Sequence, residues 1–117
     1  ALRKSLELLW GKYPRLRVLI QAPSYRFWVD ENYTFIDDSD THQTTRGQVL
    51  PDYVAKIKEI ATDYKTPFQD DYHNLGFNRY NIDAYFTYAT NGDGTHPNVA
   101  GTKIMGEKTA YSLINLV

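Results

Sequence analysis

Arg15-Leu16-Arg17-Val18-Leu19-Ile20-Gln21-Ala22-Pro23 has a continuously apolar centre, Val18-Leu19-Ile20, and ends at a proline. A short apolar run of this kind is typical of a strand that is buried on both faces of a parallel sheet. Just upstream, apolar residues at three- and four-residue spacing between 2 and 13 predict an amphipathic helix, which Pro14 ends. We therefore expect this helix to pack on a parallel sheet.

Helical and strand patterns alternate through the rest of the chain. A helix is predicted over 50–64, a second short strand over 66–72, a further helix over 77–88 and a terminal helix over 98–117. The mixed segment 24–49 is expected to be a long loop. This alternation predicts a layered α/β fold with parallel strands. Two strands are too few for a stable open sheet, so part of the sheet is missing from this stretch of sequence.

Composition narrows the classes of function. The 117 residues suffice for at most one domain, with 42% hydrophobic and 23% charged residues, which is ordinary for a globular protein. A formal charge of -1 gives no reason to expect nucleic acid or an anionic membrane surface as a partner. The absence of cysteine excludes disulfides, thiolate zinc sites and cysteine nucleophiles. No apolar run is long enough to span a membrane, and secreted, phage-borne and cytoplasmic locations all stay open.

An acid and an imidazole lie three residues apart in the glycine-rich stretch Asn91-Gly92-Asp93-Gly94-Thr95-His96-Pro97-Asn98. Glycine on either side of Asp93 lets the backbone bend tightly, so the carboxylate can fold back toward the His96 ring. A carboxylate on one ring nitrogen leaves the other free to accept a proton, as a general base for a hydroxyl nucleophile requires. The alternative is a turn into a helix capped by Asn98, with His96 merely exposed.

Asp93-Gly94-Thr95-His96-Pro97-Asn98, followed by Gly101 and a helix, resembles the last conserved block of the SGNH (GDSL-type) hydrolases. The order of elements before it resembles the closing half of that family, so the resemblance covers nearly the whole chain, although only 93–98 is specific. It implies that 1–117 is the C-terminal portion of one flavodoxin-like SGNH hydrolase domain, a three-layer α/β/α sandwich with parallel strands. The N-terminal portion, about 100 residues on the usual domain size, would lie in the same polypeptide or a separate chain.

The same resemblance assigns roles to two residues. His96 would be the general base that deprotonates a serine, and Asp93 would orient its imidazole. The serine and the oxyanion donors belong to earlier blocks of the family that this sequence lacks; Gly76-Phe77-Asn78-Arg79 is rejected as one of them because Arg79 stands where Asp is expected. The implied reaction is hydrolysis of a small-molecule or carbohydrate ester, such as an O-acetyl group, and no metal or organic cofactor is implied.

A second hypothesis comes from the tyrosine content. The chain has 10 Tyr and 15% aromatic residues, and tyrosine suits wet binding surfaces. A non-catalytic module on the same framework could use such a surface to bind a glycan or a protein. Several of these tyrosines could equally lie at the rim of a small core.

Three further clusters have two interpretations each. Tyr25, Phe27 and Trp28 follow the first strand, where open α/β sheets place ligand crevices, and either line an acyl or sugar pocket or cover the core. Two acidic clusters with a histidine have the chemistry of a cation site but match no calcium-loop spacing, and a solvated acidic loop is the favoured interpretation. They are Asp37, Asp38, Asp40 and His42 in one case, and Asp70, Asp71 and His73 in the other.

Overall fold

The computed structural model describes residues 1–116, which form helices around short strands. Along the chain, the elements are α1 (Leu2–Lys12), β1 (Ile20–Gln21), β2 (Phe27–Val29), β3 (Phe35–Asp38), α2 (Leu50–Asp63), β4 (Phe68–Gln69), α3 (Asp71–Asn74), α4 (Ile82–Tyr85), α5 (Tyr88–Asn91) and α6 (Val99–Ile114). Within this range no helix combines the length and apolar character that a bilayer crossing requires.

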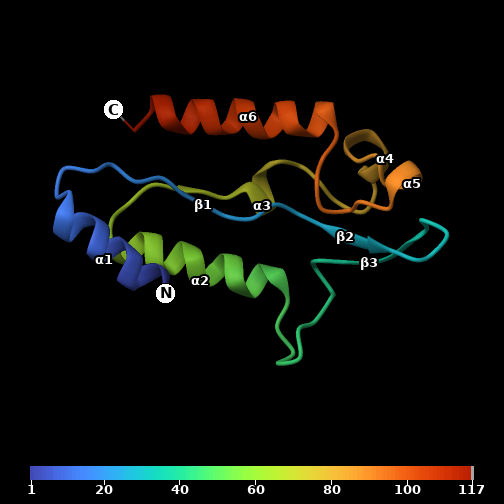
Figure 1. Cartoon of the computed structure of the whole chain (residues 1–117), viewed down its shortest axis with the longest axis horizontal. Coiled ribbons are helices and arrows are strands. Elements are labelled where there is room, and N and C mark those ends of the chain that lie inside the picture. Colours follow the sequence, from blue (N-terminus) through green and yellow to red (C-terminus); the bar gives the residue numbers. More distant parts are fainter. Residues whose placement is uncertain (117) are drawn as a thin grey trace.

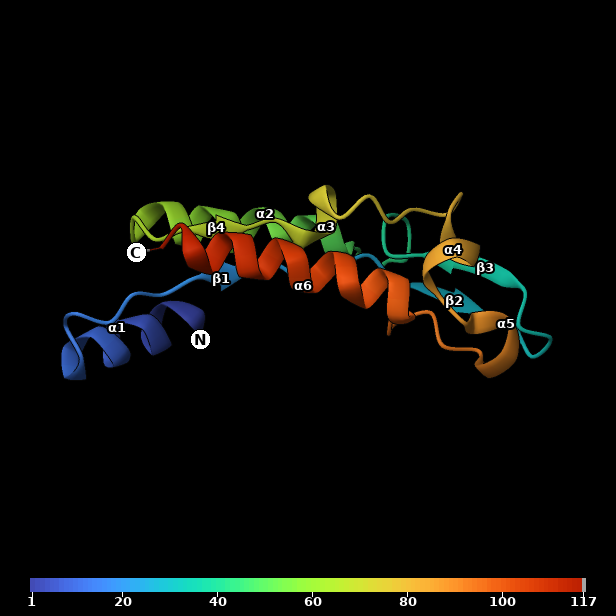
Figure 2. The same ribbon diagram turned by 90° about the horizontal axis from the view of Figure 1, so that it is seen from above.

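A parallel strand pair, β1 and β4, lies at the centre of the fold. Ile20 is the register partner of Phe68, and Gln21 that of Gln69. Helix α6 runs along one side of these strands, and α1 and α2 lie on the other (Figure 1; Figure 2 gives the view from above). The predicted mixed α/β fold with parallel strands and flanking helices is therefore confirmed, although the strands are shorter than predicted.

Two apolar clusters hold the elements together. Leu6 of α1, Ile20 of β1, and Ile60 and Ala61 of α2 form one cluster, so the amphipathic helices pack on the strand as their spacing predicted. The larger cluster joins the segment after β1 to α2 and to the region between β4 and α6. Its buried members are Ala22, Tyr25, Phe27, Val54, Tyr72, Leu75, Phe77, Ile82 and Phe86. This second cluster lies beneath the loop that carries Asp93 and His96.

The described chain is flat and open. Its extents are 50 × 34 × 19 Å, and its radius of gyration is 16.3 Å, against about 13 Å for a compact domain of this length. Its accessible surface is 7918 Å², against about 6500 Å² for a compact chain of this mass. Large apolar side chains are exposed on α1 and α6, among them Leu8 and Ile114. Strand β1 pairs with β4 alone among residues 1–116, so one edge of β1 is open to a further strand. The exposed apolar side chains of α1 and α6 are likewise open to further packing.

The segment 24–49, predicted as a long loop, contains an antiparallel hairpin of β2 and β3. Its turn is closed by Asp30, whose Oδ1 accepts hydrogen bonds from the backbone N–H groups of Asn32 and Thr34. Tyr33 in this turn has φ 61°. Aromatic and β-branched residues on both sides of an Asp-Glu-Asn turn are a hairpin signal, so the prediction was wrong on evidence that the sequence contains.

The helix predicted over 77–88 is also wrong as a single element. Residues 77–81 are not helical, because asparagine side chains there bind local backbone in place of a helical ladder. Asn81 accepts from the Asn78 backbone N–H and donates to the Gly76 carbonyl. The helix α4 that follows stops at Phe86, whose backbone is extended (φ -138°, ψ 150°), and α5 begins only at Tyr88. The strand predicted over 66–72 is likewise confined to β4, and its last residues turn into α3 with Asp70 as the N-cap.

Candidate functional site

The loop between α5 and α6 is anchored at both ends. Helix α5 ends at Gly92, which has φ 70° and serves as a left-handed C-cap. At the other end, Asn98 caps α6 by accepting a hydrogen bond of 3.0 Å from the Gly101 backbone N–H. The Asn98 side chain also donates to the Ala84 carbonyl. Both ends of a seven-residue bend around His96 are therefore fixed to the body of the domain.

The middle of this loop touches β2 directly. The Phe27 backbone N–H donates a 3.0 Å hydrogen bond to the Gly94 carbonyl. A Cβ atom at Gly94 would lie 2.2 Å from the Phe27 carbonyl oxygen, so no side chain fits there. Glycine at 94 is thus required by close approach of two backbones, and this contact sets the distance between the motif loop and the hairpin.

Asp93 and His96 form an oriented acid–imidazole pair. Asp93 Oδ2 lies 2.9 Å from His96 Nδ1, and its Oδ1 accepts from the backbone N–H groups of Thr95 and His96 at 2.8 and 3.0 Å. The His96 N–H hydrogen bond is the main cause that lowers the pKa of Asp93, with smaller contributions from Thr95 and the imidazole. Asp93 is therefore ionised at neutral pH, and its carboxylate favours a proton on Nδ1, which leaves Nε2 as the acceptor.

An Asp–His pair by itself does not single out a site in this protein. All three histidines have Nδ1 within hydrogen-bond reach of an aspartate: Asp37 for His42, Asp70 for His73 and Asp93 for His96. Asp70 is the N-cap of the short helix that contains His73, which is a structural role. What sets His96 apart is its position beside a cavity at the carboxyl end of β1, where open α/β sheets bind ligands.

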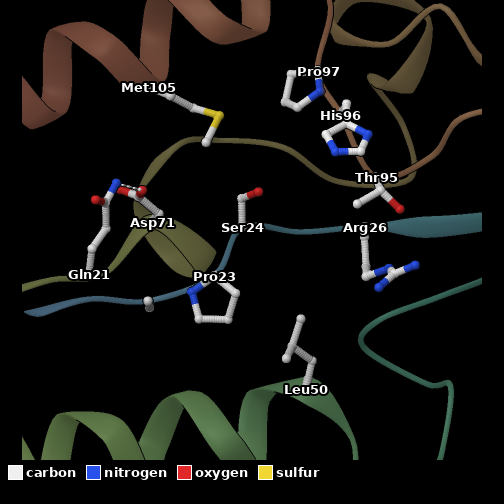
Figure 3. Close-up of a pocket in the computed structure, with 11 residues that line it drawn as sticks. Gln21, Pro23, Ser24, Arg26, Leu50, Asp71, Thr95, His96, Pro97 and Met105 are labelled. Atoms are coloured by element: carbon white, nitrogen blue, oxygen red, sulfur yellow. Dashed lines mark hydrogen bonds between the residues drawn. The ribbon is translucent and has the colours of Figure 1, made fainter. Parts of the chain in front are cut away.

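That cavity has a volume of about 430 Å³, and we call it the main cavity because it contains the candidate base; a hollow at the start of α6, lined by Val99, has a similar volume of about 460 Å³. Gln21, Pro23 and Ser24 enter it from the end of β1, and His96 comes from the motif loop (Figure 3). His96 has a side-chain exposure of 83%, against 32% for Asp93. The base is therefore open toward the cavity, while its partner is held in the loop.

Sequence reasoning did not place Ser24, Arg26 or Asp71 in the main cavity, and considered Asp71 only as part of an acidic cluster. Ser24 and Arg26 follow β1 on the chain, and Asp71 follows β4. Asp71 is buried and accepts hydrogen bonds from the side-chain amides of Gln21 and Gln69, so it bridges the two parallel strands. The signal that could have found Ser24 and Asp71 is position, because each lies just after a strand of the parallel pair, whereas Arg26 directly precedes β2 and carries no such signal.

The aromatic residues expected at the site separate into two groups. Tyr25 and Phe27 are buried in the core at 2% exposure each. The Tyr25 hydroxyl donates to Asp38, and burial together with this hydrogen bond raises the pKa of Tyr25. Trp28 instead lines a second cavity of about 170 Å³, where its ring stacks on His42 with 4.1 Å between ring centroids. Of the three aromatic side chains, Trp28 is the one that a ligand can reach in these two cavities.

The acidic cluster after β3 is largely a structural network. Asp38 is fully buried and pairs with Arg79 at 3.0 Å, which contradicts the expectation of a solvated loop at this residue. Asp40 accepts from the buried Tyr72 hydroxyl, and Asp37 accepts from Thr41. Among residues 1–116, no group of three His, Asp or Glu side chains is arranged to hold a metal ion.

The protein is similar to known proteins in its three-dimensional structure and not detectably in its sequence. No family model and no curated protein sequence matches the chain. Solved structures that match include one with TM-score 0.71 at 19% identity over 97% of this chain. Others are a Lactobacillus plantarum protein, with TM-score 0.69 at 20% identity over 96%, and a possible lipase from Chitinophaga pinensis DSM 2588, with TM-score 0.59 at 16% identity over 96%.

The chain spans only part of these structures, namely 50%, 50% and 58% of their respective lengths. At such identities the likeness shows a shared fold and not a shared activity. The fold of this chain is therefore similar to about half of each of these larger structures, one of which is a possible lipase.

Proposed function

We propose that the chain is the C-terminal portion of an SGNH-type serine hydrolase that cleaves an ester, with His96 as general base and Asp93 as its orienting partner. The observation that carries this proposal is the oriented Asp93–His96 pair at the edge of the main cavity, at the carboxyl end of a parallel strand. The resemblance of 93–98 to the closing block of that family adds the reaction class.

In this proposal His96 Nε2 takes the proton of a serine hydroxyl as its oxygen attacks the ester carbonyl. His96 then gives the proton to the leaving alcohol, and the acyl group stays on the serine. Water attacks the acyl-enzyme in the same way, so one ester and one water yield one acid and one alcohol. Asp93 stays ionised throughout and stabilises the imidazolium, which its low pKa supports.

The serine and the oxyanion donors are proposed to lie in the N-terminal portion of the domain, in the same polypeptide or in a separate chain. Three observations support this: the chain spans about half of the similar structures, β1 has one strand partner, and apolar side chains are exposed on α1 and α6. Additional parallel strands beside β1 would bring a serine toward the main cavity and cover part of the exposed His96.

The proposed substrate is a small-molecule or carbohydrate ester such as an O-acetyl group, with Trp28 as an aromatic contact beside the main cavity. The competing hypothesis of a tyrosine-rich binding module has less support. Its most exposed tyrosines are Tyr80, which precedes α4, and Tyr111 on α6, and neither lines the main or the second cavity.

The test uses the full-length protein that contains this chain and measures p-nitrophenyl acetate hydrolysis. His96→Ala should lower kcat/KM by about 10²- to 10⁴-fold, because general-base catalysis contributes on that scale. His73→Ala is the matched control, since it removes another Asp–His pair outside the main cavity. Equal turnover of the His96 variant and the unaltered protein would contradict the proposal.

A second measurement locates the nucleophile. A fluorophosphonate probe labels an activated serine, and peptide mapping then identifies it. Labelling outside this chain is the expected result. Labelling of Ser24, which shares the main cavity with His96, would keep the hydrolase but overturn the assignment of the serine to the N-terminal portion.

A further inference from the structure

Arg26 is the cation that the two cavities share. It lines the main cavity together with His96, and it lines the second cavity together with Trp28 and His42. Its guanidinium carbon lies 4.8 Å from the centre of the Trp28 ring. In Figure 3 the Arg26 side chain lies at the same end of the main cavity as Thr95 and His96, away from Gln21 and Asp71.

The charge of Arg26 has no anionic partner within residues 1–116. Its side chain makes no ion pair and no hydrogen bond there, and its Nε atom is enclosed without an acceptor. By contrast, Arg79 pairs with Asp38, and Arg3 pairs with Asp63.

Asp71 is the acidic residue among those that line the main cavity, and the residues that line the second cavity include no acid. The Asp71 carboxylate accepts hydrogen bonds from the side-chain amides of Gln21 and Gln69, and within residues 1–116 it forms no ion pair with Arg26. In neither cavity is a carboxylate of this chain therefore paired with the guanidinium.

A guanidinium that is partly removed from water without a counter-charge is energetically unfavourable, and an incoming anion relieves that cost. The planar fork of arginine also suits carboxylate and phosphate oxygens, and stacking on an indole ring restricts the orientation of the fork. These conditions favour a ligand that brings a negative charge to this end of the main cavity.

We propose that Arg26 selects ester substrates that carry an anionic group, a carboxylate or a phosphate, next to the ester that His96 helps to cleave. This inference rests on the proposed function and deepens it. The anion would lie at the Arg26 end of the main cavity, because the buried carboxylate of Asp71 at the opposite end repels it. Arg26 would thus act on substrate choice and not on the proton transfer.

The experiment measures kcat/KM of the full-length protein on three phenyl acetates of similar shape. They are acetoxybenzoate with a carboxylate, acetoxybenzamide as its neutral isostere and acetoxyphenyl phosphate, each as the 3- and 4-isomer. The variants are Arg26→Gln and Arg26→Lys, with Arg17→Gln as the control because Arg17 is exposed and lines neither cavity.

The unaltered protein should prefer an anionic ester over the benzamide, and Arg26→Gln should reduce that preference by about 10- to 100-fold, the scale of a charged hydrogen bond. Arg26→Lys should keep part of it, because it retains the charge without the fork. Arg17→Gln should leave the preference unchanged. Comparison of the benzoate with the phosphate ester shows which anion fits better.

An unchanged preference in Arg26→Gln would overturn the inference, as would an equal loss on charged and neutral esters, since that result would indicate a structural partner for Arg26. If His96→Ala and the unaltered protein are equally inactive on every ester, the proposed function fails instead. Calorimetric titration of benzoate and of inorganic phosphate then tests the anion site alone, and equal affinity in Arg26→Gln would overturn it.

Discussion

Gly94→Ala tests whether contact between the motif loop and β2 positions the catalytic base. The added Cβ would lie 2.2 Å from the Phe27 carbonyl oxygen, whereas a carbon–oxygen contact needs about 3.3 Å. The two segments must therefore separate by about 1 Å, because the obstructing atom is backbone and cannot rotate away. The backbone of Gly94 is outside the left-handed region, so the effect comes from this collision and not from φ.

We expect two consequences of this separation. Overpacking, plus weakening of the hydrogen bond from Phe27 to the Gly94 carbonyl, should lower the free energy of unfolding by about 2 to 4 kcal/mol. Displacement of His96 by about 1 Å should lower esterase kcat/KM by about 10²-fold at a temperature where the variant is folded. Thermal unfolding and p-nitrophenyl acetate hydrolysis of the full-length protein measure the two effects.

Gly106→Ala is the matched control for this substitution. Gly106 lies within α6 and has open space where a Cβ would be, so alanine there should stabilise the helix by about 0.5 to 1 kcal/mol and leave activity unchanged. The reasoning is refuted if Gly94→Ala unfolds at the same temperature as the unaltered protein and hydrolyses the ester at the same rate. Loss of stability with full activity would show that the contact is structural only.

Three further results are expected. Hydrogen bonds hold the pKa of Asp93 in the folded state below its ordinary value of 3.8. The stability that ionised Asp93 gives to the loop is therefore complete above pH 3.8 and is lost as the pH falls through the lower folded-state pKa. The amide NMR shifts of Thr95 and His96 should titrate with a midpoint below pH 3.8, and a midpoint at or above that pH would contradict the assignment. Asn98→Ala should destabilise the domain by about 1 kcal/mol in chemical unfolding through loss of the α6 cap, whereas Asn98→Ser should recover most of that loss. Asp38→Asn should cost about 1.5 to 3 kcal/mol in the same assay, because it removes the buried charge that accepts from Tyr25 and pairs with the half-exposed Arg79; a cost below about 0.5 kcal/mol would show that this charge is not needed for the fold.

Local patterns were reliable where one short-range interaction dominates. The amphipathic spacing of α1 and α2 follows from which side chains can share one helix face. The same holds for the turn that brings Asp93 to His96 and for the Asn98 cap, because each is closed within a few residues. The apolar run Val18-Leu19-Ile20 predicted the place of β1 but not its extent, because only Ile20 of the run is in the strand and buried.

Tertiary structure alone decided which of three similar Asp–His pairs lies beside the cavity at the carboxyl end of β1, and which aromatic residues are buried. Gly94 is required because β2, some 67 residues earlier on the chain, passes against it, and no local pattern records that approach. The proposed role of Arg26 likewise depends on tertiary structure, because its side chain lines two cavities and forms no ion pair within residues 1–116. The Asp93–His96 pair is formed within a few residues, so the sequence alone could predict it. The cavity and the backbone contact around the pair are formed by segments that are distant along the chain, so they could be identified only in the folded structure.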